Sequence, residues 1–119
     1  MEIGMARIGQ AVEPGTVRIL VDRLWPRGIA KASASWDLWA RDLAPSTNLR
    51  RWYAHDPEKY AEFRHRYRQE LDKAPGPLLS EVLEIVQRQR TVLVTYAREV
   101  PLSHVPVLRE YLLDCVRRG

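Results

Sequence analysis

The sequence is short of the features that define several specialised protein classes. It has a single cysteine, Cys115, so no disulfide can form within the chain and we expect a reducing, cytoplasmic setting. Its apolar runs, such as Ile19–Val21, fall far below the ~20 residues that a membrane-spanning helix requires. Residues Met1–Gly4 lack the basic, apolar and small-residue order of a secretion signal. These absences exclude a disulfide-stabilised scaffold and predict no membrane partner.

Sequence signals for cofactors and metals are also missing. The six glycines never form a GxGxxG or GxxxxGK pattern, which disfavours nucleotide binding by a glycine-rich phosphate loop. His55, His104 and Cys115 lack the spacing of metal ligands, such as two histidines four residues apart on a helix. His65 lies among charged residues and is interpreted as solvated. We therefore expect no metal and no cofactor.

The composition that remains is that of one soluble domain, residues 1–119. The 119-residue chain is 45% hydrophobic and 29% charged, the usual balance of a globular protein. Folding at this length removes roughly two-thirds of the unfolded surface from water, which is enough for one core. The net charge of +4 comes from 19 basic and 15 acidic side chains and is spread thinly along the chain. This charge permits a polyanionic partner without requiring one.

Three segments have the composition of strands. Met5–Ile8 is the first, and Val17–Val21 is a clearer one because glycine and proline bound it on both sides. The third, Thr91–Tyr96, is an apolar β-branched run that suits a strand buried on both faces. About eight residues separate the first two strands, too few for a parallel crossover, so direct pairing of these two would have to be antiparallel.

Most of the chain between the second and third strands has helical patterns. A short helix is predicted from Ser35 through Trp39, and another begins at Ser46 or Thr47 and carries Tyr53. The clearest start is Asp56–Glu58, where an N-cap residue, a proline and an acid follow one another. The apolar stripe of that helix consists of Tyr60, Phe63, Tyr67 and Leu71.

Two more helices complete the pattern. Pro75–Pro77 ends one helix and starts the next, whose buried stripe contains Val82 and Val86 with Leu79 and Leu83. Ser103 opens the last helix, which tolerates Pro106 in its first turn. Its buried residues are predicted to be Val105, Leu108, Leu112 and Cys115, which makes the thiol a small hydrophobe and not a nucleophile.

This order of elements favours an α/β fold. We expect a small three-layer sandwich with a mostly parallel sheet, helices on both sides, and a helical insertion between the second and third strands. In such sheets ligands bind in the crevice beyond the carboxyl ends of the strands. The residues that follow each strand are therefore the candidates for a site.

The second strand is followed by the sequence VDRLWPRG, Val21–Gly28. Arg23 and Arg27 can present guanidinium groups to a phosphate or carboxylate, and Asp22 can orient Arg23 or act as a base. The alternative is that Asp22 pairs with one of these arginines and simply holds a loop. Trp25 is interpreted as a packing residue in preference to a stacking surface for a ligand.

The third strand is followed by Tyr96, Arg98 and, five residues later, His104. If both strands run the same way, these side chains approach the same crevice as Asp22 and Arg27. The helix dipole favours a neutral His104, which suits an acid or base role, whereas the alternative is a residue bonding backbone in the first turn. Asp22 and His104 are thus the candidate catalytic pair, and Arg23, Trp25, Arg27, Tyr96 and Arg98 the candidate ligand-binding residues. His55 is interpreted mainly as part of a helix start.

These motifs resemble domain of unknown function family 488, in its short YeaO-like branch. The resemblance runs from about Arg7 to the last helix. It is carried by Val21–Gly28, Trp36, Trp39, Ala44–Ser46, Leu49, Arg50, His55, Phe63, Tyr67, Glu70 and Leu71. Where the family usually has Tyr-Ser-Ala-Lys-Asp and later Asn-His-Ala, this chain has Thr95–Glu99 and Ser103–Val105, which keeps His104 but replaces the lysine and the asparagine. The resemblance implies an α/β fold and a pocket between Val21–Gly28 and the start of the last helix. It implies no particular reaction.

Three hypotheses follow from these residues. The first is a pocket for a small phosphorylated or carboxylated molecule in an enzyme or sensor. The second is a nucleic-acid-binding module, whose positive charge would come from Arg50, Arg51, Arg64, Arg66 and Arg68. The third is a subunit that only binds other proteins. The sequence leaves open whether the first of these includes catalysis.

Overall fold

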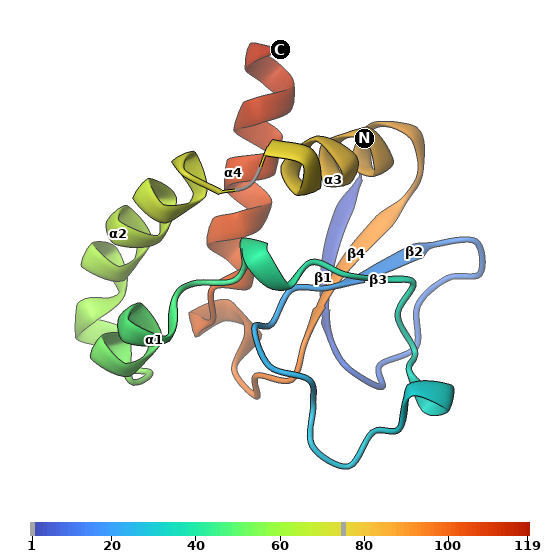
Figure 1. Cartoon of the computed structure of the whole chain (residues 1–119), viewed down its shortest axis with the longest axis horizontal. Coiled ribbons are helices and arrows are strands. Elements are labelled where there is room, and N and C mark those ends of the chain that lie inside the picture. The colour runs from blue at the N-terminus through green and yellow to red at the C-terminus, as the bar shows by residue number, and fades with distance from the viewer. Residues whose placement is uncertain (1, 75) are drawn as a thin grey trace.

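The computed structural model, shown in Figure 1, describes residues 2–74 and 76–119. Its sheet has four parallel strands in the order β1-β4-β2-β3. The strands are β1 (Ile3–Arg7), β2 (Val17–Leu20), β3 (Leu38–Trp39) and β4 (Thr91–Thr95). The helices are α1 (Thr47–Tyr53), α2 (Tyr60–Asp72), α3 (Gly76–Arg88) and α4 (Val105–Arg118). The predicted α/β class and parallel sheet are confirmed.

The last strand in sequence, β4, lies in the middle of the sheet. Thr91, Leu93 and Thr95 are fully buried, as the apolar β-branched run predicted. β1 and β2 pair with β4 on either side, so Ile3 and Val17 both stand opposite Thr91. Because β4 separates them, β1 and β2 are parallel, and the antiparallel pairing that direct contact would have required does not arise.

The segment predicted as a short helix at Ser35–Trp39 forms strand β3 instead. Leu38 and Trp39 pair with Ile19 and Leu20 of β2. The Asp37 side chain also accepts a hydrogen bond from the Arg18 amide at 2.8 Å. These long-range bonds at the edge of the sheet outweigh a weak local helix preference.

The predicted helix starts are present where side chains cap them. Ser46 Oγ accepts from the Leu49 amide at the start of α1, and Asp56 Oδ1 accepts from the Glu58 amide. Asp56 begins the 3-10 helix Pro57–Lys59, which leads into α2. α3 begins at Gly76, and Pro75, predicted to separate α2 from α3, lies outside the described residues.

The main core fills the space between one sheet face and the four helices. Ile19 and Leu93 of the sheet pack there with Phe63 and Tyr67 of α2 and Leu108 of α4. The opposite face, made by Ala6, Leu20 and Val94, packs against Trp36 and Trp39. Tryptophans from the β2–β3 connection and from β3 thus cover the side where helices had also been expected. Figure 1 shows this connection extending away from the helices.

The burial of Cys115 and the polarity of the helices were also predicted from the sequence. Cys115 is only partly buried on α4, beside the core that Val105, Leu108 and Leu112 enter fully. In the described part of the chain, every helix is too short or too polar to cross a bilayer.

Candidate functional site

A cavity of about 710 Å³ opens at the carboxyl ends of β2 and β4; we call it the cleft. One wall is the loop after β2, from Asp22 to Arg27, and another is α1 with His55, the second residue after its end. The segment after β4 and the start of α4 contribute Tyr96 and His104. The cleft therefore lies where parallel α/β sheets place their ligands.

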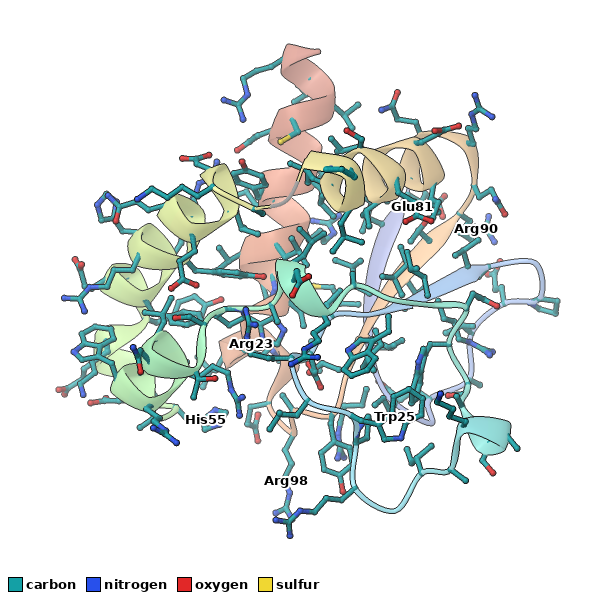
Figure 2. The ribbon with its side chains drawn as sticks, viewed as in Figure 1. Arg23, Trp25, His55, Glu81, Arg90 and Arg98 are labelled. Atoms are coloured by element: carbon teal, nitrogen blue, oxygen red, sulfur yellow. The ribbon has the colours of Figure 1, made fainter. Side chains whose placement is uncertain are left out.

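Six of the seven predicted site residues line the cleft. They are Asp22, Arg23, Trp25, Arg27, Tyr96 and His104. Arg98 does not line it, because its exposed side chain extends away from the body of the molecule, as Figure 2 shows. The turn after β4 keeps Tyr96 at the rim and directs Arg98 into solvent.

Asp22 joins β2 to β4. Its Oδ1 accepts from the Thr95 hydroxyl at 2.7 Å, and its Oδ2 accepts from the Tyr96 amide at 2.8 Å. Its backbone carbonyl accepts from the Trp39 indole at 2.7 Å. These bonds agree with the alternative that Asp22 holds a loop in place. Its side-chain partners are Thr95 and Tyr96, however, and not Arg23 or Arg27.

His104 lies directly behind Asp22. Its Nε2 is 2.8 Å from the Val21 carbonyl oxygen and 3.5 Å from Asp22 Oδ1, so Nε2 carries the proton and donates it to the carbonyl. Its ring also meets Tyr67 edge-on at 6.0 Å. His104 therefore agrees with both interpretations from the sequence: it forms a hydrogen bond with the backbone, and it also lines the cleft.

Burial lowers the pKa of His104 below its ordinary value of about 6.5. The Asp22 carboxylate and the Val21 carbonyl act against this, whereas Arg50 and His55 add to it. The imidazole is therefore neutral at pH 7, as predicted, although desolvation is the largest cause. Arg50 and His55, at the end of α1, line the same cleft as His104.

This pKa shift predicts a loss of stability in mild acid. The unfolded chain binds a proton at His104 near pH 6.5, whereas the folded chain binds it only at lower pH. Below about pH 6.5 the unfolded state thus holds more protons, and the free energy of unfolding falls by up to about 1.4 kcal/mol per pH unit. Urea denaturation between about pH 5 and 7 measures this slope. The slope should flatten in His104→Gln, and an unchanged slope in that variant would contradict the assignment.

Arg23 and Trp25 are engaged by the protein itself. Arg23 donates from Nε to the Pro45 carbonyl and from its terminal nitrogen to the Ala44 carbonyl, each at 3.0 Å. Trp25 donates to the Ile29 carbonyl and meets Trp36 and Trp39 edge-on, with ring centres 4.9 and 5.4 Å away. These contacts agree with the packing interpretation of Trp25, and they make Arg23 a brace between the β2 loop and the start of α1.

Three other arginines of the cleft have exposed side chains. Arg27 comes from the β2 loop, and Arg50 and Arg51 come from the last turn of α1. In residues 2–74 and 76–119 none of the three forms an ion pair. The sequence had assigned Arg50 and Arg51 to nucleic-acid binding. Their place in the cleft depends on how α1 packs on α2, where Tyr53 stacks on Phe63 at 4.3 Å, and no local pattern reveals that.

His55 was interpreted as part of a helix start but also lines the cleft. It follows α1 with φ 57°, and the preceding Ala54 has φ 47°, so two consecutive residues adopt the left-handed conformation. This conformation is uncommon for residues other than glycine. The turn ends α1 and brings the imidazole to the cleft wall, while Asp56 performs the capping that the sequence had predicted around it.

The arginines of α2 differ from those of the cleft because acids neutralise them. Arg64 pairs with Glu110 of α4, and Arg66 pairs with Glu62 on the same helix. Arg68 pairs with Asp114 at 3.0 Å. Carboxylates therefore offset the positive charge of Arg64, Arg66 and Arg68, three of the five arginines on which the nucleic-acid-binding hypothesis rested.

Comparison with known proteins identifies the family. A family model described as "Inactive DUF488-N3 subclade" matches residues 2–119. The chain belongs to the DUF488 family. It is 39% identical over 111 residues to the uncharacterized protein Rv3073c of Mycobacterium tuberculosis, covering 92% of each chain. It is 38% identical over 97 residues to the uncharacterized protein YeaO of Escherichia coli, covering 80% of this chain and 82% of that one. No solved structure matches.

Two other features of this DUF488 chain bear on its site. Within residues 2–74 and 76–119, no three His, Cys, Asp or Glu side chains are grouped so as to hold a metal ion. A second, smaller cavity of about 260 Å³ lies on the other side of Arg23. Its lining includes two acids, Asp42 and Glu70, alongside Arg23 and Lys73, so it lacks the positive surplus of the cleft.

Proposed function

We propose that the cleft binds a small molecule that carries a phosphate or carboxylate group. The observation that carries this proposal is the convergence of Arg27, Arg50 and Arg51 on one cavity, with their guanidinium groups exposed and outside the ion pairs of the described chain. Guanidinium groups bind phosphate and carboxylate oxygens through paired hydrogen bonds. Among the described residues that line the cleft, the one carboxylate is that of Asp22, and it already accepts two hydrogen bonds from the protein.

The proposed function is ligand binding and includes no chemical conversion of the ligand. The word "inactive" in the description of the matching family model supports binding over turnover. The geometry supports it too, because Asp22 and the Nε2 of His104 are both engaged by protein partners. Arg27, Arg50 and Arg51 hold the anion, Tyr96 forms the rim, and Arg23 and Trp25 keep the walls in place. The catalytic role of Asp22 and His104 and the ligand contact of Arg98 stay predictions.

Isothermal titration calorimetry with inorganic phosphate tests the proposal. We expect measurable binding, and we expect the Arg50→Ala/Arg51→Ala double variant to raise the Kd at least about tenfold, which corresponds to about 1.4 kcal/mol. Both side chains are exposed, so their removal leaves the core intact. The matched control is Arg88→Ala on α3, whose side chain is 74% exposed and does not line the cleft; its Kd should stay within about twofold. Equal affinity of the double variant and the wild type would overturn the proposal.

A further inference from the structure

The walls of the cleft carry their positive charges at two separate places. Arg27 belongs to the loop after β2, whereas Arg50 and Arg51 belong to α1. Figure 1 shows α1 and this loop as separate segments of the chain, and Figure 2 shows His55 and Trp25 on different sides of Arg23. A single phosphate group bound at one of these places would leave the charge at the other uncompensated.

Aromatic and apolar side chains also line the cleft. Tyr53 and Phe63 are buried and line it from α1 and α2. Leu24 and Tyr96 line it too, although they are 62% and 52% exposed. In the part of the chain that the structure describes, Leu24 and Tyr96 are the two most exposed large apolar side chains, and both line the cleft. Exposed apolar residues gathered in a hollow are typical of a surface that a ligand covers.

The size of the cleft agrees with a ligand larger than an inorganic ion. Its volume of about 710 Å³ falls inside the range of roughly 300–1,000 Å³ found for small-molecule sites. A single inorganic ion would fill only a small part of this volume.

Building on the proposed function, we infer that the ligand is an elongated molecule with an anionic group at each end and an apolar body between them. One anionic group binds Arg27 and the other binds Arg50 and Arg51, while the body covers Leu24 and Tyr96. Because two linked groups bind almost as one event, each end strengthens the binding of the other.

Calorimetry with three related probes tests this ligand class. The probes are inorganic phosphate, phenyl phosphate and hydroquinone bisphosphate, which add first a ring and then a second anionic group. We expect the Kd to fall at least about tenfold at each step. Terephthalate, the dicarboxylate of the same shape, shows by comparison with the bisphosphate which anionic group the cleft prefers.

Variants separate the two ends. Arg27→Ala should raise the Kd of hydroquinone bisphosphate at least about tenfold, to that of phenyl phosphate. Arg88→Ala should leave this Kd unchanged. The inferred ligand class is overturned if the bisphosphate binds no more tightly than phenyl phosphate while inorganic phosphate still binds. Failure of all probes to bind would instead overturn the proposed function itself.

Discussion

Replacing Asp22 with alanine should lower the free energy of unfolding by about 3 kcal/mol. The carboxylate accepts hydrogen bonds from the Thr95 hydroxyl and the Tyr96 amide, and hydrogen bonds to a charged group contribute about 1.5–3 kcal/mol each. Thr95 is fully buried in the folded chain, and its hydroxyl would lose the carboxylate that accepts its hydrogen bond. Urea denaturation measures the change.

Asp22→Asn is the matched control for this prediction. Its amide oxygen still accepts from the Tyr96 amide, but its NH₂ group faces the Nε2–H of His104, so we expect about half of the alanine effect. An alanine variant within about 0.5 kcal/mol of the wild type would show that Asp22 does not hold β2 to β4.

Replacing Arg23 with methionine should also lower the free energy of unfolding by about 3 kcal/mol. Arg23 donates to the carbonyls of Ala44 and Pro45, two buried residues that precede α1. Methionine keeps the apolar stem and removes both donors, which leaves two carbonyls without these partners. Because the Arg23 guanidinium already donates hydrogen bonds to protein carbonyls, the folded variant should bind inorganic phosphate with a Kd within about threefold of that of the wild type.

Arg88→Met is the control for this substitution, because Arg88 is exposed and its only partner is Glu84 one turn away on α3 in the described chain. It should change the free energy of unfolding by less than about 0.5 kcal/mol. If Arg23→Met were as stable as wild type but bound phosphate at least tenfold more weakly, Arg23 would be a ligand-binding residue and not a brace.

The position of the site could be predicted from the sequence because it depends on strand ends. The β-branched runs at Val17–Val21 and Thr91–Tyr96 identify β2 and β4, and parallel pairing brings their carboxyl ends together. That rule brings Asp22 and His104 to the same crevice, although they lie 82 positions apart in the chain, and the structure places them in contact. The geometry of parallel sheets thus relates residues that are distant in sequence, which no local pattern can do.

The α1 residues that line the cleft could not be predicted from the sequence, because their position depends on contacts between helices. Arg50 and Arg51 line the cleft only because Tyr53 packs on Phe63 and fixes how α1 lies against α2. β3 was missed for a related reason. Two residues have no reliable local preference for a strand, and β3 exists because β2 offers it an edge. Arg98 was placed in the site by its nearness to β4, but the turn after Tyr96 carries it outward.

We propose that arginines outside the ion pairs of the described residues make the cleft an anion site, and NMR tests this most directly. In a titration of the ¹⁵N-labelled protein with inorganic phosphate, we predict saturable shifts of the backbone and side-chain signals of Arg27, Arg50 and Arg51. The signals of Arg64 and Arg68, whose charges are offset by acids of α4, should stay in place. Shifts spread over all arginines, or confined to α2, would contradict the account.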